Sequence, residues 1–319
     1  MSSAIAVIGA GAFGTALSFV LAKAGRDVAL WGRDASKMMQ MQERRQSPLA
    51  VMAFPLNLRI MGPILYVPCD VVLLCVPTQN LRDVLESHHA ALADKTLVIC
   101  CKGIEHATGA LPSAVVSEIC PNARIAVLTG PSFAVDLIAG KPTALTLAAD
   151  PAFGVKLQQL LSTPLLRLYL TDDILGAQWG GALKNVVAIG AGVAMGAELG
   201  ESACAAIMTR GFAEMQRLAT DQGALRQTLA GLSGFGDLVL TCTSAQSRNF
   251  AYGLAIGAGR QPLQNQTVEG VKTAQAVAAR YGDMMPVVDM VAKLVNQEVD
   301  IKAAIKTMLD RPLKDEIEP

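Results

Sequence analysis

The stretch that decides the fold is Ala4-Ile-Ala-Val-Ile-Gly-Ala-Gly-Ala-Phe-Gly14. Its apolar start predicts a strand buried on both faces, and Gly9, Gly11 and Gly14 follow at Gly-x-Gly-x-x-Gly spacing before a helix expected to end near Gly25. The first glycine permits a tight turn, the second lets the backbone approach a pyrophosphate, and the third lets the helix lie close to the strand. The positive end of the helix dipole then faces the anion. The sequence predicts a dinucleotide-binding turn, and a merely structural glycine-rich turn is the less favoured alternative.

Apolar, strand-like runs alternate with helical stretches through the first half of the chain. This alternation favours right-handed crossovers and a mainly parallel sheet of the Rossmann type, in an α/β domain. Because ligands of such sheets lie beyond the carboxyl ends of the strands, we expect the loops carrying Gly9–Gly14, Pro77, Lys102 and Gly130–Ser132 to converge on one crevice. A proline-punctuated region follows at 48–68, and no strand is assigned to it. The expected strands are residues 4–8, 27–31, 70–76, 96–101, 124–128, 143–148 and 166–170.

From about Asp172 the pattern becomes helical. The expected helices are residues 175–199, 203–222, 249–256, 271–281 and 286–294. Gly181, Gly192, Gly196 and Gly200 indicate tight packing of the first of these helices. We therefore expect a dinucleotide-binding domain over residues 1–171 and an all-helical C-terminal domain over residues 172–319.

Composition narrows the function classes. Lys+Arg and Asp+Glu balance at 27 each, so no charge field points to nucleic acid or to an anionic membrane. Mean hydropathy is high at +0.38, but the uncharged run at residues 4–22 lacks a basic leader and carries three glycines, unlike a signal sequence or membrane anchor. The seven cysteines show no Cys-x-x-Cys spacing and histidine is scarce, which favours reduced thiols over a zinc site. We expect a cytoplasmic protein without a metal or stable membrane insertion.

Arg33 follows the second expected strand, at a position that discriminates between cofactors. In NAD-specific folds an acidic side chain near this point binds the ribose hydroxyls. Here Asp34 comes only after Arg33, whose guanidinium suits a 2′-phosphate and can stack on adenine. Tolerance of NADP, alone or beside NAD, is the hypothesis; a solvated loop arginine is the alternative.

Lys184 is the only ionisable side chain in the strongly apolar stretch of residues 177–190. Since burying an ammonium is costly, such a lysine either pairs, reaches back to solvent, or has a lowered pKa. A lowered pKa suits a general acid or base near neutrality, and Asn185 adds an amide that could orient a substrate. A snorkelling lysine and a catalytic lysine remain open alternatives.

Two further charged residues stand at the ends of apolar runs. Lys102 directly follows an expected strand, where it could bind a substrate phosphate or hydroxyl; a solvent-facing lysine is nearly as well supported. Asp237 belongs to a glycine-rich segment, residues 232–237, that is interpreted as a turn presenting one carboxylate.

The segment Ser247-Arg-Asn249 begins an expected helix with Ser247 as its N-cap. Free backbone N–H groups then gather with Arg248 and Asn249 at one helix start, which is a phosphate-binding arrangement. Ordinary helix capping is the alternative.

Together these motifs resemble the bacterial NAD(P)-dependent glycerol-3-phosphate dehydrogenases. The set Gly130-Pro-Ser-Phe-Ala134, Leu183-Lys-Asn185 and Ser247-Arg-Asn249 is highly specific, and the matches keep the family order over nearly the whole chain. The matching stretches are residues 9–17, 30–33, 102–105, 129–134, 140–144, 182–186, 236–242, 247–249, 268–270 and 311–313.

The resemblance implies hydride transfer between NAD(P)H and dihydroxyacetone phosphate, giving sn-glycerol 3-phosphate for phospholipid synthesis. It implies that Lys184 is the proton donor or acceptor at the carbinol oxygen. The implied substrate-binding residues are Lys102, Gly130, Ser132, Lys184, Asp237, Ser247, Arg248 and Asn249. Beside Gly9, Gly11 and Gly14, the implied cofactor contacts are Ala12, Phe13, Arg33, Lys102, Ala134, Arg248, Thr267 and Glu269.

Two alternative functions are retained. A different two-domain hydroxyacid dehydrogenase with a helix lysine would carry a carboxylate-binding rather than a phosphate-binding loop at Ser247–Asn249. A non-catalytic NADP-binding sensor needs no proton donor, so the presence of Lys184 with Asp237 and Arg248 argues against it. The expected partners are small molecules, with no nucleic acid, and a homodimer is compatible with the sequence.

Overall fold

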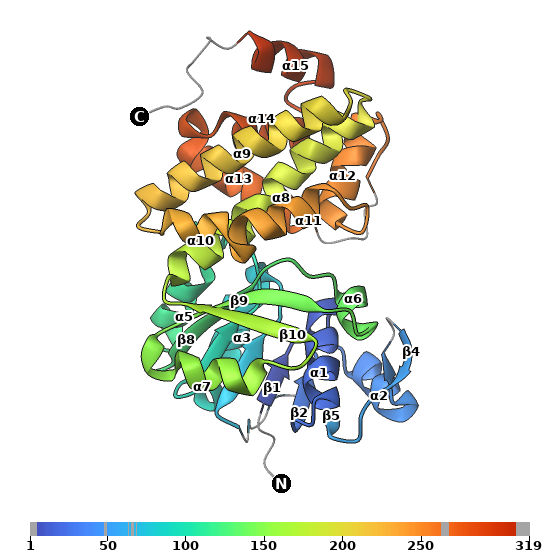
Figure 1. Ribbon diagram of the computed structural model, residues 1–319, viewed down its shortest axis with the longest axis vertical. Helices are drawn as coiled ribbons and strands as arrows, with labels where there is room; N and C mark the ends of the chain where they lie inside the picture. The colour runs from blue at the N-terminus through green and yellow to red at the C-terminus, as the bar shows by residue number, and fades with distance from the viewer. Residues whose placement is uncertain are drawn as a thin grey trace.

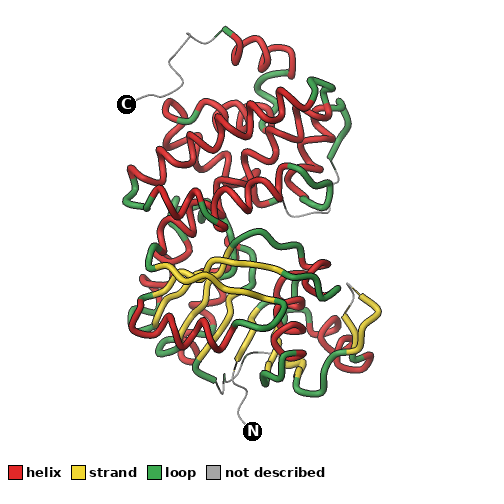
Figure 2. The backbone as a smooth tube through the Cα atoms, viewed as in Figure 1, coloured by secondary structure: helices red, strands yellow, loops and turns green. Residues whose placement is uncertain are grey.

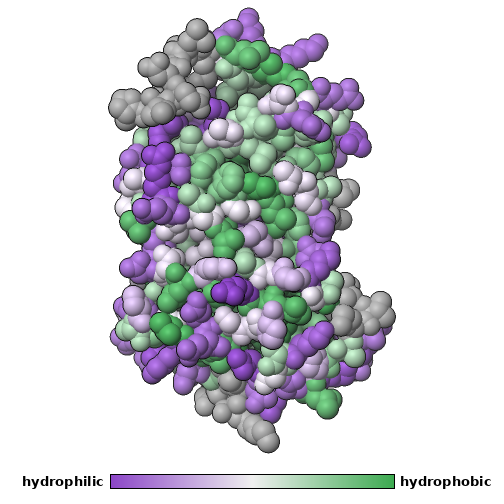
Figure 3. Space-filling view, in the orientation of Figure 1, coloured by the Kyte–Doolittle hydropathy of each residue, from purple (hydrophilic) through white to green (hydrophobic). Residues whose placement is uncertain are grey.

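The computed structural model describes residues 5–47, 50–62, 64, 67, 69–262 and 268–310. Figure 1 shows a sheet-containing part and a helical part stacked along the long axis of the molecule, and Figure 2 shows that the strands of the large sheet all lie in the first part. On the face drawn in Figure 3, apolar and polar side chains are interspersed. No helix among the described residues is long and apolar enough to cross a lipid bilayer.

One eight-stranded sheet carries the first part of the chain. Its strands, in sheet order, are β10 (Leu166–Thr171), β9 (Thr143–Ala149), β8 (Arg124–Thr129), β7 (Thr96–Ile99), β6 (Val71–Leu74), β1 (Ile5–Ile8), β2 (Val28–Trp31) and β5 (Leu58–Met61). All neighbours pair in parallel except β8 and β9, which are antiparallel. The predicted Rossmann-type, mainly parallel sheet is confirmed.

Three short strands lie inside or beside the proline-punctuated region, where no strand was expected. Strand β5 pairs in parallel with β2 at the sheet edge, and its four residues are too few for the alternation of buried Leu58 and Ile60 with exposed Arg59 to stand out. Strands β3 (Gln46–Ser47) and β4 (Ala50–Ala53) form a small antiparallel ribbon.

The central strands of the large sheet are buried on both faces, which explains their unbroken apolar sequences. In β1, Ile5 and Val7 belong to one apolar cluster, whereas Ala6 and Ile8 belong to the cluster on the other side. The helices of this part are α1 (Ala12–Lys23), α2 (Ala35–Arg44), α3 (Leu81–Ser87), α4 (His89–Leu92), α5 (Pro112–Ile119), α6 (Ala134–Ile138) and α7 (Pro151–Leu161).

The second part is helical, as predicted, and surrounds α8 (Ile174–Gly196). Residues 176–194 of α8 are all buried, which fits a helix that is apolar on every side. The other helices are α9 (Glu201–Asp221), α10 (Arg226–Ala230), α11 (Asp237–Cys242), α12 (Arg248–Gly257), α13 (Glu269–Tyr281), α14 (Pro286–Val295) and α15 (Ile301–Leu309).

Tight packing of α8 is confirmed at two of its glycines. A Cβ at Gly192 would collide with the carbonyl oxygen of Phe250, and one at Gly196 with that of Leu254, so α12 lies against the bare backbone of α8. Gly200 differs from the expectation: it lies beyond the end of α8, has φ 85°, and a Cβ there would meet no atom within 4 Å. Its role is to turn the chain between α8 and α9.

Candidate active site

The loops after four parallel strands meet, as their order in the sheet predicts. The Cys75 N–H after β6 donates to the Ile8 carbonyl of β1 at 2.8 Å. Thr78 Oγ1 then donates to the Lys102 carbonyl after β7 at 3.0 Å, and Lys102 Nζ donates to the Gly130 carbonyl after β8 at 3.2 Å. The expected convergence at the carboxyl edge of the sheet is confirmed.

The Gly9–Gly14 turn leaves room for an anion over the start of α1. Gly9 has φ 117°, and a Cβ there would lie 2.6 Å from the carbonyl carbon of Cys75. A Cβ at Gly14 would collide with the Gly9 carbonyl oxygen, whereas a Cβ at Gly11 would meet nothing within 4 Å. Gly11 also brings no side chain to cap α1, so the first N–H groups of the helix face open space. This cradle fits the pyrophosphate of NAD(P)H.

The expected cofactor contacts next to this turn lie on α1 and α6. Ala12 is the exposed first residue of α1, and Phe13 is half-buried against the core. Ala134 is the first residue of α6, the helix that packs beside α1. Thr267 and the matching stretch at 311–313 lie outside the described residues.

The end of β2 carries Arg33 and a cation that sequence reasoning missed. Arg33 is exposed, and Asp34 is engaged as the N-cap of α2, where its Oδ1 accepts from the Lys37 N–H at 3.0 Å. Lys37 Nζ donates to the Ala10 carbonyl, inside the glycine turn, at 2.7 Å. The only signal for Lys37 in the sequence is its position one helical turn after the cap.

A buried cluster of two ammonium groups and one carboxylate lies beside Gly130. Asp237, 1% exposed, accepts from Lys102 Nζ at 2.5 Å and from Lys184 Nζ at 2.8 Å. Lys184 is 7% exposed and also donates to Thr241 Oγ1 at 2.7 Å. The snorkelling alternative for Lys184 is therefore wrong, because its ammonium is buried and paired. Lys102 is paired rather than solvent-facing.

Adjacent glycines of α8 make this cluster possible. A Cβ at Gly181 would lie 2.9 Å from Thr129 Oγ1, and one at Gly180 would lie 2.6 Å from the Ser233 carbonyl oxygen. The bare backbone of α8 thus lies between the end of β8 and residues 232–236, and Lys184 follows one turn later. Residues 232–236 are a short π-helix that runs directly into α11, so the predicted turn before Asp237 is wrong. A π-helix leaves no pattern of apolar spacing that distinguishes it from a glycine-rich turn.

Electrostatics in the cluster set the pKa of each partner. Burial lowers the pKa of Lys184 to about 8; the Lys102 charge also lowers it, while the Asp237 charge acts in the opposite direction. Burial acts to raise the pKa of Asp237, but attraction to Lys102 and Lys184 outweighs burial and keeps the pKa below its usual value. The lysine is therefore poised to exchange a proton near neutral pH.

The segment Ser247–Asn249 lies where three helices meet. Ser247 Oγ accepts from the Phe250 N–H at 3.2 Å, which confirms the predicted N-cap of α12, and Arg248 is exposed at the first helical position. Asn249 Nδ2 donates to Asn185 Oδ1 at 3.0 Å, and Asn249 Oδ1 accepts from the Gly270 N–H at 3.0 Å. Asn249 thereby ties α12 to α8 and to the start of α13.

Glu269 stands at the start of α13 and completes the charge distribution. Burial raises the pKa of Glu269, against the lowering effect of Arg248, Lys102 and Lys184. The three cations are therefore its electrostatic neighbours. Among the described residues, Thr129 Oγ1 and Ser132 Oγ are buried without a hydrogen-bond partner, as expected for groups that bind a ligand.

Two family models match this chain over most of its length. The N-terminal model of NAD-dependent glycerol-3-phosphate dehydrogenase matches residues 4–152, and the C-terminal model matches residues 173–306. The chain belongs to the NAD-dependent glycerol-3-phosphate dehydrogenase family. The resemblance inferred from the sequence motifs is confirmed.

Individual members of the glycerol-3-phosphate dehydrogenase family match end to end. The glycerol-3-phosphate dehydrogenase [NAD(P)+] of Roseobacter denitrificans is 51% identical, over 98% of this chain and 99% of the relative. The glycerol-3-phosphate dehydrogenase [NAD(P)+] of Paracoccus denitrificans is 50% identical, over 98% of this chain and 99% of the relative. The crystal structure of glycerol-3-phosphate dehydrogenase from Coxiella burnetii superimposes with a TM-score of 0.92 at 33% identity, covering 97% of this chain and 99% of that chain.

A hydroxyacid dehydrogenase is a far more distant structural neighbour. The complex of D-mandelate dehydrogenase with NADH has a TM-score of 0.59 at 17% identity, covering 92% of this chain and 98% of that chain. At that identity the likeness concerns the fold alone. Because D-mandelate dehydrogenase has a similar fold, the fold does not distinguish this chain from hydroxyacid dehydrogenases. Membership of the glycerol-3-phosphate dehydrogenase family does.

Proposed function

We propose that this protein catalyses the reversible NAD(P)H-dependent reduction of dihydroxyacetone phosphate to sn-glycerol 3-phosphate. The observation that carries the proposal is the buried Lys102–Asp237–Lys184 cluster at the carboxyl edge of the sheet, in a chain whose relatives are named for this activity. Bound NAD(P)H supplies a hydride to the carbonyl carbon of the substrate.

We assign Lys184 the role of proton donor to the ketone oxygen, and of acceptor in the reverse direction. With a pKa of about 8 its ammonium is charged at neutral pH yet gives up a proton more readily than an ordinary lysine. Asp237 orients that ammonium through the 2.8 Å contact. Lys102, on the other oxygen of Asp237, offers a second donor to a substrate oxygen.

The substrate phosphate belongs at the start of α12. Ser247 Oγ accepts from the Phe250 N–H as the helix cap, and its O–H can still donate to the anion, beside the Arg248 guanidinium and the first N–H groups of the helix. Asn249 holds this helix start against α8. The Ser132 hydroxyl, which is buried without a hydrogen-bond partner, and the Gly130 loop are proposed to contact the substrate from the sheet side. A phosphate rather than a carboxylate is favoured because the relatives are named for glycerol 3-phosphate and Arg248 offers a guanidinium at this helix start.

The cofactor-binding residues follow the path from the glycine turn to the cluster. Gly9, Gly11, Ala12, Phe13 and Gly14 hold the pyrophosphate, and Ala134 borders them from α6. Arg33 binds the adenosine end. At the nicotinamide end the proposed contacts are Lys102, Arg248 and Glu269. The resemblance also implies a cofactor contact at Thr267, which lies outside the described residues.

Domain boundary, location and assembly complete the proposal. We place the domain boundary near Asp172, supported by the end of β10 at Thr171 and the start of α8 at Ile174. The seven cysteines are unpaired, which supports a reducing location such as the cytoplasm. Use of the product in phospholipid synthesis is proposed from the family resemblance. Homodimer formation stays a prediction, testable by sedimentation.

The deciding experiment follows loss of nicotinamide absorbance with dihydroxyacetone phosphate, comparing NADH with NADPH. The proposal requires turnover with the phosphorylated ketone. Turnover with 2-oxo acids instead would favour a hydroxyacid dehydrogenase. Tight NADPH binding without turnover on either class would favour a sensor.

A further inference from the structure

Lys102 is the third residue of a segment that has no regular secondary structure of its own. Residues 100–111, here called the Lys102 loop, connect β7 to α5 and contain neither helix nor strand. Gly103 has φ 128°, a conformation that glycine adopts more readily than other residues. No helix or strand fixes the path of the chain after Lys102, so contacts with neighbouring residues must fix it. What holds this loop therefore decides where the Lys102 ammonium lies.

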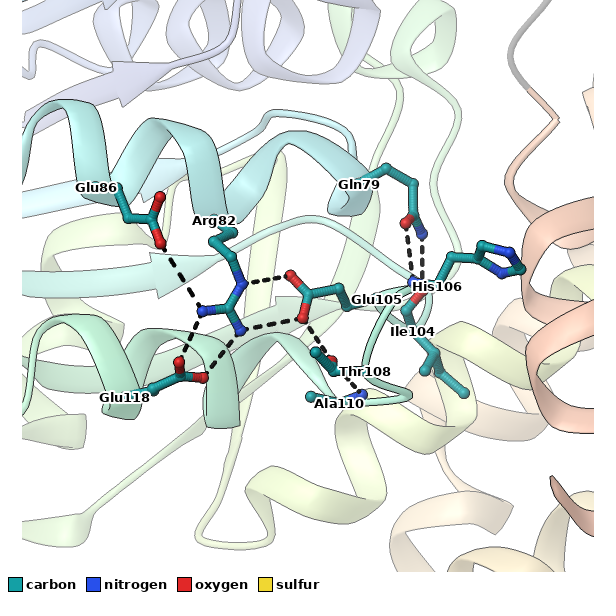
Figure 4. Close-up of polar contacts among 9 residues, drawn as sticks. All are labelled: Gln79, Arg82, Glu86, Ile104, Glu105, His106, Thr108, Ala110 and Glu118. Atoms are coloured by element: carbon teal, nitrogen blue, oxygen red, sulfur yellow. Dashed lines mark hydrogen bonds and ion pairs between the residues drawn. The ribbon is translucent and has the colours of Figure 1, made fainter.

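The main chain of the Lys102 loop is bound by the segment that follows β6. Gln79 Nε2 donates to the Ile104 carbonyl at 2.8 Å, and Gln79 Oε1 accepts from the His106 N–H at 2.9 Å. Thr78 Oγ1 binds the Lys102 carbonyl itself at 3.0 Å. Figure 4 shows the Gln79 amide forming its contacts at the point where the loop turns.

Arg82, the second residue of α3 and three residues after Gln79, binds a side chain of the loop. Its Nε and Nη2 donate to the two carboxylate oxygens of Glu105 at 2.9 and 3.1 Å. Glu105 Oε2 also accepts from Thr108 Oγ1 at 2.5 Å, so the loop closes on itself around this carboxylate. The side chain of Glu105 is 9% exposed, and a bidentate, nearly buried pair of this kind fixes geometry.

A second carboxylate on the same guanidinium provides a built-in comparison. Glu118 of α5 accepts from Arg82 Nη1 at 2.8 Å and from Nη2 at 2.9 Å, but its side chain is 61% exposed and it does not belong to the loop (Figure 4). Exposed pairs of this kind contribute little to stability. Glu105 binds Arg82 from within the Lys102 loop, whereas Glu118 binds Arg82 from outside it. Substituting each in turn therefore separates the effect of losing a loop contact from the effect of losing any carboxylate partner of Arg82.

We propose that Gln79 and Arg82 are positioning residues that hold the Lys102 loop, and through it keep the Lys102 ammonium against Asp237. The inference rests on the role proposed above for Lys102. A misplacement of about 1 Å at a reacting group can reduce the rate by about 100-fold, so residues outside the pocket can control turnover in this way.

The first test compares Glu105→Gln and Arg82→Gln with Glu118→Gln as the matched control. Loosening the Lys102 loop should lower kcat/KM for dihydroxyacetone phosphate by roughly 10-fold or more, whereas Glu118→Gln should leave it unchanged. Because the Lys102 charge lowers the pKa of Lys184, the alkaline limb of kcat/KM should also move to higher pH in the first two variants. An unchanged kcat/KM in both loop variants would overturn the proposal.

The second test repeats Arg82→Gln in a Lys102→Ala background, with folding checked by circular dichroism. If Arg82 acts through Lys102, the second substitution should add almost nothing to the loss of kcat/KM. A multiplicative loss would mean general structural damage and would refute the positioning role. If Lys102→Ala alone has no effect, the proposed function of Lys102 fails instead. Should Arg82→Gln fail to fold, Gln79→Ala replaces it in the same cycle with the same required outcome.

Discussion

Lys184 Nζ lies 2.8 Å from Asp237 Oδ1, although the two residues are 53 positions apart and belong to different helices. Each is buried and each would be costly alone, so neither charge is tolerable without a partner of opposite sign. The pair also leaves the second oxygen of Asp237 for Lys102. Two cations therefore share one anion. In the proposed mechanism the surplus positive charge stabilises the ketone oxygen, which gains negative charge during reduction.

The pH dependence of ketone reduction should report this arrangement. Reduction needs the protonated Lys184, so kcat/KM should be level below the pKa of about 8 and fall as the pH rises through it. Because Asp237 raises that pKa, Asp237→Asn should move the limb to lower pH. Initial rates with saturating NADH would be measured from about pH 6 to about pH 10, where the upper limit is close to the pKa of an ordinary lysine. This range covers the alkaline limb of the native protein and that of Asp237→Asn.

The control for this shift is Glu214→Gln. Glu214 is likewise a buried carboxylate, but it accepts from the Val287 and Val288 N–H groups at the start of α14. The Glu214→Gln substitution should lower the free energy of unfolding without moving the alkaline limb of kcat/KM. If the limb stayed in place in Asp237→Asn, the titration would not belong to Lys184.

Lys184→Ala should abolish turnover, with a loss of at least about 100-fold, while NADPH binding remains nearly normal. The physical reason is that the remaining Asp237 keeps its 2.5 Å partner Lys102, so no unpaired charge is left buried. Stopped-flow turnover and fluorescence titration of NADPH would measure the two effects separately. Normal turnover in this variant would remove Lys184 from the mechanism.

The sequence predicts the sheet and the buried lysine for good physical reasons. Strands buried on both faces are continuously apolar, so β1, β6 and β7 are evident, and an isolated charge such as Lys184 stands out in an apolar helix. The edge strand β5 is too short to show its period. The pairing of Lys184 with Asp237 depends on how α8 and α11 pack, which no local pattern contains.

The residues that sequence reasoning missed act through contacts with the backbone or with a partner. Thr241 accepts from Lys184, Lys37 donates to the Ala10 carbonyl, and Thr78 donates to the Lys102 carbonyl. Their side chains are common in type and belong to no spacing pattern. Only the three-dimensional arrangement brings them to the site.

Arg33→Asp should weaken NADPH far more than NADH, by roughly 10- to 100-fold, because it places a negative charge beside the 2′-phosphate. Asp34 Oδ1 is engaged as the N-cap of α2, which leaves Asp34 Oδ2 for a ribose hydroxyl. Dissociation constants for both cofactors would be measured by fluorescence. Arg44→Asp, at the exposed far end of the same helix, is the control. An equal loss for both cofactors would contradict the assignment of Arg33.

Arg248→Ala should raise KM for dihydroxyacetone phosphate by about 10- to 100-fold, because it removes a charged donor from the phosphate site. The helix itself should persist, since its cap is the Ser247 hydroxyl and not the arginine. Arg226→Ala is the matched control, because Arg226 is also exposed and also the first residue of a helix, α10. Inorganic phosphate should inhibit the native protein competitively and the Arg248 variant much less. An unchanged KM, with equal inhibition of both proteins, would place the phosphate elsewhere.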